Sequence, residues 1–246
     1  MDWNELRGQL ADVHGDVETS ASLPPACYAD EAVHRREVDA VFRRSWVGIG
    51  RADRWAEPGD FAAFTLTGIP LVVLCDEEGA LRAFANCCRH RGTRLLDGDG
   101  NCRHIICPFH GWTYSLDGRL AGAPKMERAR GFHKADHGLV AFRIEAREGF
   151  VFVCLDDEAP GLDDWLGDFS DLHAPWSLGT MVSTRRREFE VGCNWKAFLE
   201  VFNEYYHLPY VHGESLGTVY DAPDDGDKVR GNYASQFGTT QGTGGV

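Results

Sequence analysis

Two short cysteine–histidine pairs are the residues of this chain whose types and spacing point most clearly to a chemical role. Cys88 and His90 are two positions apart, and sixteen residues follow before the second pair begins. In that second pair, Cys107 and His110 are three positions apart. Two thiolates and two imidazoles are a ligand set for either a zinc ion or a 2Fe–2S cluster with mixed ligands. The spacing therefore predicts a metal site built from two loops.

The order of the ligands favours the cluster over zinc. In a Rieske centre two cysteines bind one iron and two histidines bind the other, so each loop supplies one residue of each type. A common Cys₂His₂ zinc finger instead groups cysteine with cysteine and histidine with histidine. Glycine and proline in both loops favour tight turns around a ligand. A structural zinc site is the alternative.

The residues around these pairs resemble the Rieske domains of ring-hydroxylating-type oxygenases. The similarity lies in Cys87-Cys-Arg-His-Arg-Gly92, in Cys107-Pro-Phe-His-Gly-Trp112, and in the continuation Thr-Tyr-Ser-Leu-Asp-Gly-Arg-Leu. The resemblance implies a 2Fe–2S cluster whose ligands are Cys88, His90, Cys107 and His110. Because the family pattern is Cys-x-His, it implies Cys88 and not Cys87 as the ligand. Cys102 and His104 lack the following Arg-Gly and are interpreted as structural.

A second group of metal-binding residue types lies in residues 194–207, which are predicted to form one helix that ends before Pro209. At 100° per residue, Glu200, Glu204 and His207 fall at about 0°, 40° and −20° on one stripe. Such a stripe is costly to bury unless a metal or hydrogen-bond partners satisfy it. With His212, the imidazole of His207 begins a two-histidine, one-carboxylate site for non-haem Fe(II), which leaves positions open for oxygen.

The spacing Glu204-x-x-His207-x-x-x-x-His212 is similar to the mononuclear iron motif of the same oxygenase family. The resemblance implies Fe²⁺ at His207 and His212. It also implies that Glu204 bridges His110 of one subunit and His207 of the next, in a homotrimer or other homo-oligomer. The glutamate form resembles the branch that acts on quaternary amines such as carnitine or choline. Val201 and Gly213 depart from the Asn and Pro that are frequent in the family.

The family's third iron ligand is an Asp or Glu on a later helix, but only 34 residues follow His212. The acidic residues Asp221, Asp224, Asp225 and Asp227 occur in a sequence typical of a solvated turn. The third carboxylate ligand is therefore not identified. We expect the catalytic domain to be incomplete in this chain.

The resemblance and the distribution of helical and β-rich runs along the sequence together predict an α+β protein. Residues 1–45 are expected to be helical and to pack on the catalytic domain. Residues 46–157 carry short β-rich runs and are expected to form the all-β Rieske domain, inserted before residues 158–246, the N-terminal part of a helix-grip-type α+β catalytic domain. A charged strand is predicted over residues 183–191.

Composition excludes several classes of protein. The 246 residues carry a net charge of −13, which argues against a nucleic-acid partner. No apolar run approaches the roughly 20 residues of a membrane span, and no secretory signal is recognised, so we expect a cytoplasmic protein. The eight cysteines favour metal binding over disulfides, and Cys75 and Cys154 are expected in the core.

The leading functional hypothesis is the oxygenase (α) component of a Rieske non-haem iron system. The chain has no glycine-rich dinucleotide fingerprint, so an NAD(P)H-dependent reductase or a ferredoxin is expected to supply the electrons. Oxygen would then be inserted into a small organic substrate by monooxygenation or dioxygenation. One alternative is a Rieske ferredoxin-like electron carrier with a residual catalytic domain. A zinc-stabilised binding module is the other.

Overall fold

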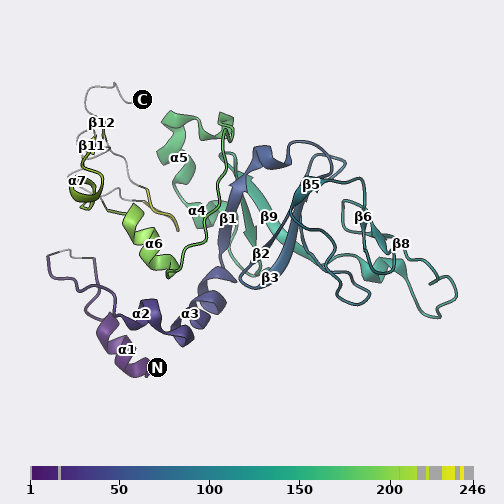
Figure 1. Cartoon of the computed structure of the whole chain (residues 1–246), viewed down its shortest axis with the longest axis horizontal. Helices are drawn as coiled ribbons and strands as arrows, with labels where there is room; N and C mark the ends of the chain where they lie inside the picture. Colours follow the sequence, from purple (N-terminus) through teal and green to yellow (C-terminus); the bar gives the residue numbers. More distant parts are fainter. Residues whose placement is uncertain are drawn as a thin grey trace. The chain divides into compact units, whose positions relative to one another are not determined.

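The computed structural model describes residues 2–15, 18–204, 206–214, 220–221, 229–235 and 239–240. The chain divides into two compact units. The first, the helical unit, comprises Met1–Ala40, Asp163–Trp176 and Arg187–Val246. The second, the β unit, comprises Val41–Leu162 and Ser177–Arg186. Helices and strands both contribute, as the α+β prediction requires (Figure 1).

The β unit is built on two antiparallel sheets. The larger has seven strands in the order β1-β10-β9-β4-β3-β2-β5, and the smaller has three in the order β6-β7-β8. The strands are β1 (Trp46–Arg51), β2 (Asp60–Leu66), β3 (Ile69–Cys75), β4 (Leu81–Ala85), β5 (Asp99–Asn101), β6 (Ile105–Ile106), β7 (Thr113–Tyr114), β8 (Leu120–Gly122), β9 (Ala141–Arg147) and β10 (Phe150–Cys154). Short helix η2 (Ala52–Trp55) lies between β1 and β2, and η3 (Lys134–His137) lies between β8 and β9. Helix η1 (Val38–Phe42) precedes β1, and η5 (Leu178–Thr180) lies in the second segment of the unit.

Strand β3 explains how the β unit holds together. Residues 71–75 are all buried, which fits a continuous apolar run in a strand covered on both faces. Leu71 and Val73 face a core that includes Trp55 and Val151. Val72 and Leu74 face a second core, which contains Cys88, Cys107, Trp112 and Tyr114. Strand β3 thus contributes to both hydrophobic cores of the unit, including the one that contains residues of the two predicted cluster loops.

The apolar runs predicted as strands are strands β2, β3, β4, β6 and β10 in the structure. Cys75 and Cys154 are buried as expected, at 2% and 0% exposure. The prediction of a charged strand over residues 183–191 is wrong. Those residues are exposed and form no strand. Side chains hold the start of this segment, because Ser183 donates from its backbone N to Asp53 and Arg186 pairs with Asp99.

The helical unit contains α1 (Trp3–Leu10), α2 (Ala26–Ala29), α3 (Glu31–Glu37), α5 (Phe169–His173), η4 (Ala174–Trp176), α6 (Trp195–Phe202), α7 (Leu208–Val211) and the pair β11 (Tyr220–Asp221) and β12 (Thr239–Thr240). Helix α4 (Leu162–Leu166) begins at the last residue of the β unit's first segment. Asp2 and Asp30 cap α1 and α3 by accepting hydrogen bonds from backbone N–H groups of the first turn. Leu6, Cys27 and Val33 form a small core between these helices.

The single helix predicted over residues 194–207 is wrong in its extent. Helix α6 begins after the Asn194 cap and ends at Phe202, where Asn203 donates from its backbone N to the carbonyl of Glu200. Pro209 does not mark the end of this helix. It lies in the first turn of α7, where a missing N–H costs no hydrogen bond. Within the described ranges, none of the helices has the length and apolar character needed to cross a bilayer.

Candidate metal centres

The two predicted cluster loops have the same backbone construction. In the first loop, Cys88 donates from its N–H to the carbonyl of Thr93, and Gly92 donates to the carbonyl of Cys88. In the second loop, Cys107 donates to Trp112 and Gly111 donates to Cys107. Gly92 and Gly111 have φ values of 75° and 70°, the left-handed conformation that glycine adopts without a steric penalty.

These loops bring the four predicted ligands together. The rings of His90 and His110 lie 4.8 Å apart, centroid to centroid, at an angle of 71°. Cys88 and Cys107 are buried at 3% and 2% exposure, whereas both histidines are exposed. The thiols therefore lie on the buried side of the site and the imidazoles on the exposed side. This arrangement suits a cluster in which one iron takes two cysteines and the other takes two histidines.

The surroundings of Cys107 favour a thiolate. Burial is the largest single influence on the pKa of this thiol and acts to raise it, whereas hydrogen bonds from the backbone N–H groups of Phe109 and His110 act to lower it. Contacts with the side chains of Cys88 and Thr93 act in the same direction, so the pKa of Cys107 is lowered. A sulfur that accepts backbone hydrogen bonds is suited to hold iron in a 2Fe–2S cluster.

Tyr114 lies directly behind the first loop and is fully buried. Its phenol oxygen is 3.3 Å from the Cys88 sulfur and accepts a hydrogen bond from the Arg89 backbone N at 2.9 Å. Burial and the contact with Cys88 raise the pKa of Tyr114. The phenol therefore stays protonated and can donate its hydrogen to the sulfur.

Trp112 supports the histidine side of the same site. Its ring stacks on His90 at a centroid distance of 4.8 Å and an angle of 11°. Trp112 is only 2% exposed, so this stacking restrains the His90 ring from inside the protein. Asn86 secures the chain after the first loop, since its side-chain oxygen accepts from the backbone N of Leu95 and Leu96.

The second predicted centre is formed by residues around α7. His207 precedes this one-turn helix and His212 follows it, and their rings lie 5.4 Å apart between centroids. Glu204 accepts hydrogen bonds from the backbone N of His207 at 3.1 Å and from its ring Nδ1. The hydrogen bond from the His207 ring is the main reason that the pKa of Glu204 is lowered. A carboxylate at Nδ1 leaves Nε2 of His207 free to bind a metal.

Glu200 does not join this group, contrary to the predicted stripe. Both of its carboxylate oxygens accept from the hydroxyl of Tyr28, at 2.8 and 3.0 Å. Burial and this carboxylate raise the pKa of Tyr28 to about 12. The reason is that α6 ends at Phe202, so a continuous helical period does not relate Glu200 to His207.

Among the described residues, no three His, Cys, Asp or Glu side chains converge on one metal position. A Rieske cluster needs none, because each of its irons takes two protein ligands. At the second centre, the two histidines are placed together and a third ligand is not identified. Of the acidic run, Asp224, Asp225 and Asp227 lie outside the described residues, and Asp221 is described only as part of β11.

Two family models match this chain. The model of the Rieske [2Fe-2S] domain matches residues 45–140, and that of the ring hydroxylating alpha subunit catalytic domain matches residues 178–245. The chain belongs to the Rieske-type ring-hydroxylating oxygenases. Residues 88–110 of the first match include both cluster loops, so the Rieske domain is the part of the family that the β unit represents.

Individual relatives agree with this assignment. The glycine betaine monooxygenase oxygenase subunit of Chromohalobacter salexigens is 32% identical over 89% of this chain and 50% of its own length. The biphenyl 2,3-dioxygenase subunit alpha of Rhodococcus jostii is 34% identical over 77% of this chain and 43% of its own length. The chain thus spans about half the length of these curated relatives.

A solved structure of a quaternary ammonium Rieske monooxygenase has the same fold. It superimposes with a TM-score of 0.77 at 30% identity, over 82% of this chain and 57% of the other. That structure is described as giving insights into carnitine oxidation by gut microbiota and inter-subunit electron transfer. The identity is high enough for the likeness to extend beyond the fold to the family.

The ligand pattern in the sequence does not indicate the residues that support the cluster ligands. Trp112 and Tyr114 stand out only as part of the family-like sequence, and Thr93 and Asn86 carry no signal of this kind. The available signal was position: Trp112 and Tyr114 follow His110 by two and four residues, in a loop and strand that must pack against the site.

Proposed function

We propose that this chain forms the oxygenase (α) component of a Rieske non-haem iron oxygenase. One observation supports the proposal: in the chain that carries the four candidate cluster ligands, the rings of His207 and His212 also lie 5.4 Å apart, beside Glu204. An electron carrier has no use for the second group. Relatives that are oxygenase subunits also favour the oxygenase proposal over the electron-carrier alternative.

Cys88, His90, Cys107 and His110 would hold the 2Fe–2S cluster, which supplies one electron at a time when bound. The chain's own part is to fix the ligands and their environment. The backbone N–H groups of Phe109 and His110 stabilise the Cys107 thiolate, and Tyr114 donates to the Cys88 sulfur. Trp112 holds the His90 ring in plane by stacking on it.

His207 and His212 would hold mononuclear Fe²⁺, which supplies oxygen activation when bound. Glu204 keeps the His207 ring in one tautomer and orientation through the hydrogen bond at Nδ1. We infer that the same carboxylate also accepts from His110 of a neighbouring subunit, because a carboxylate has lone pairs for two imidazole donors. The functional form would then be a homotrimer or other homo-oligomer.

Residues 1–45 are proposed to pack on the catalytic part of the chain. Within the helical unit, Glu37 of α3 accepts from Trp195 Nε1 at 3.0 Å and from Lys196 Nζ at 2.6 Å. Tyr28 of α2 reaches Glu200 of α6. These contacts tie the N-terminal helices to the helix that leads to the iron-binding residues.

The reaction proposed is oxygen insertion into a small organic substrate, with electrons from an NAD(P)H-dependent reductase or a ferredoxin. Relatives named for a quaternary amine and for an aromatic ring match at 32% and 34% identity. Their common property is the oxygenase reaction, and the proposal rests on that property.

The test compares metal and sulfide in the anaerobically purified chain with His207→Ala and His212→Ala variants. We expect about two irons per chain in the cluster plus additional mononuclear iron, and loss of only the additional iron in either variant. Acid-labile sulfide should be unchanged. Equal iron in all three proteins would leave the electron carrier as the better account, and zinc without sulfide would contradict both.

A further inference from the structure

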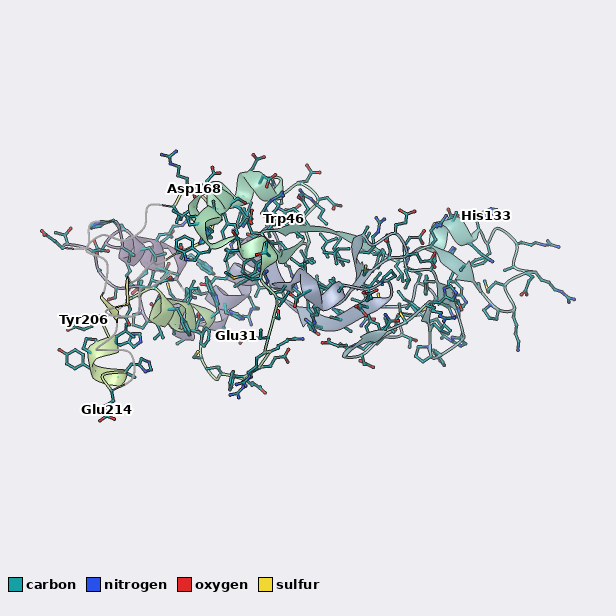
Figure 2. The ribbon with its side chains drawn as sticks, turned by 90° about the horizontal axis from the view of Figure 1, so that it is seen from above. Glu31, Trp46, His133, Asp168, Tyr206 and Glu214 are labelled. Carbon is teal, nitrogen blue, oxygen red and sulfur yellow. The ribbon has the colours of Figure 1, made fainter. Side chains whose placement is uncertain are left out.

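The loop of residues 124–134 forms a surface beside the cluster that the proposed reaction leaves unassigned. It borders a cavity of about 600 Å³, whose walls include Gly111, Thr113, Met126, Glu127, Phe132 and Lys134. Figure 2 shows His133 at the end of the β unit remote from Trp46, with side chains of the loop projecting around it. We call this surface, residues 124–134 with the cavity, the loop face.

The loop face lies in the basic part of an acidic protein. Residues 86–140 contain nine Lys or Arg and five Asp or Glu, a net charge of +4, in a chain whose net charge is −13. Arg128 and Arg130 are exposed on the loop itself. Among the salt bridges of the described residues, neither of them is paired with a carboxylate. Such a local excess of positive charge attracts an acidic partner and steers its approach.

Aromatic rings connect this face to a cluster ligand. Phe132, in the cavity wall, lies 5.5 Å from Trp112 between ring centroids, and Trp112 stacks on His90 at 4.8 Å. His137 packs against both Phe132, at 4.7 Å, and Trp112, at 5.7 Å. Electron transfer slows steeply as the gap between redox groups widens. A row of rings in contact therefore marks this side of the Rieske domain as a route inward.

We propose that the loop face docks an acidic one-electron carrier protein and that the electron enters the cluster through Phe132, Trp112 and His90. This rests on the proposed function, because it requires the cluster. The reduced carrier loses one electron and the cluster gains it, with no atom or proton transferred. The exposed His110 is assigned to the exit toward a second copy of the chain. The donor therefore needs a different entrance, and the loop face supplies one.

The test measures binding and cluster reduction in the full chain, anaerobically and without organic substrate. The probe is a plant-type [2Fe–2S] ferredoxin, an acidic one-electron carrier. For the charge reversal Arg128→Glu with Arg130→Glu, we expect the dissociation constant to rise about tenfold or more at low salt, because like charges then meet at the contact. The wild-type affinity should fall as salt is added. For Phe132→Leu, we expect slower cluster reduction in stopped-flow absorbance at an unchanged dissociation constant.

A matched control reverses two exposed arginines of the helical unit, Arg7→Glu with Arg36→Glu, which changes the net charge equally. It should bind the ferredoxin as the wild type does. Dithionite should reduce the cluster in every variant, which shows that the site is intact. Equal weakening in both double variants, no binding by the wild type, or a change of oligomeric mass in place of a change of donor affinity would each overturn the docking proposal.

The outcomes separate this proposal from the one on which it rests. A cluster that dithionite reduces normally, with ferredoxin reduction unaffected by Arg128→Glu, Arg130→Glu and Phe132→Leu, removes the loop face and leaves the oxygenase assignment standing. A chain without acid-labile sulfide removes both.

Discussion

The phenol oxygen of Tyr114 lies 3.3 Å from the sulfur of Cys88, inside a core from which water is excluded. Hydrogen bonds to cluster sulfurs raise the reduction potential, because they stabilise the extra negative charge of the reduced state. Tyr114 is not a predicted metal ligand. Through this contact it would nevertheless influence the reduction potential of the cluster.

Replacing Tyr114 with Phe should lower the reduction potential of the cluster by roughly a few tens of millivolts, the size expected for one lost hydrogen bond. Iron and sulfide content should be retained, since none of the four ligands is changed. A redox titration followed by circular dichroism measures the potential. Tyr28→Phe, which removes a hydroxyl that binds Glu200 in the other unit, is the control and should have no effect. An unchanged potential in Tyr114→Phe would show that the hydroxyl does not act on the sulfur.

Replacing Glu204 with Gln should slow electron delivery to the mononuclear iron by roughly 10- to 100-fold, while cluster and iron contents stay near the wild-type values. The amide group presents one acceptor oxygen in place of two, so it cannot serve two imidazoles. Oxygen-dependent reoxidation of the pre-reduced cluster, followed by stopped flow, reports the rate. Glu200→Gln is the matched control and should reoxidise normally. Equal rates for Glu204→Gln and the wild type would exclude the bridging role.

The β unit should lose stability in acid through Asp76. Burial alone would raise the pKa of this carboxyl, but hydrogen bonds from Arg82, Ala80 and Glu78 outweigh it and hold the pKa below its usual value. Because the folded-state pKa is the lower one, the stabilisation is complete well above pH 4 and is lost as the pH falls through the folded-state value. Asp76→Asn should therefore lower the free energy of unfolding by about 1–3 kcal/mol at pH 7.

Denaturant unfolding at several pH values checks the Asp76 prediction. The difference between the wild type and Asp76→Asn should shrink toward pH 3. Asp117→Asn is a useful comparison, because the pKa of Asp117 is also lowered, chiefly by Ser115, but its partner Arg119 is 84% exposed. Its effect should be smaller. A pH-independent difference for Asp76→Asn would mean that ionisation of this carboxyl does not stabilise the fold.

Helix α3 should detach more readily when Glu37 is lost. Its carboxylate joins Lys196 and Trp195 in a mostly buried group, with side-chain exposures of 17% for Glu37 and 11% for Lys196. Removing one partner leaves the other charge poorly solvated, so Glu37→Ala should cost about 2–4 kcal/mol in the helical unit. Limited proteolysis within the first 40 residues should accelerate. Glu31→Ala, which breaks the exposed pair with Arg35, should leave the cleavage rate unchanged.

The meeting of the four predicted cluster ligands was predictable because its information is local. Cys88, His90, Cys107 and His110 lie in two loops whose glycines fix the backbone, and their spacing together with the family resemblance indicated that the loops meet. The apolar run at β3 likewise predicts a strand, and the structure shows that residues 71–75 of this strand are buried. What the sequence did not indicate is tertiary: that Tyr114 reaches Cys88, or that Trp112 stacks on His90, depends on how two sheets pack.

The segment that is predicted to bind mononuclear iron shows the opposite case. An apolar and aromatic run with helical period favoured one helix through His207, although Asn203 is of a residue type that often follows the end of a helix. The structure instead ends α6 at Phe202, so Glu204 meets His207 through a turn. Glu200 pairs with Tyr28, 172 residues earlier, which periodicity cannot anticipate. The predicted pairing of His207 with His212 does not depend on the length of α6. The single turn of α7 lies between the two histidines and brings their rings together.

The most direct test of the account is acid-labile sulfide together with low-temperature EPR of the anaerobically purified, dithionite-reduced chain. The account predicts about two sulfides per chain and a rhombic Rieske-type signal. Both should be lost in Cys107→Ser and kept in Cys102→Ser, because Cys102 is a packing residue beside the site. Zinc in place of iron and sulfide, or a cluster that persists in Cys107→Ser, would contradict the assignment of the four ligands.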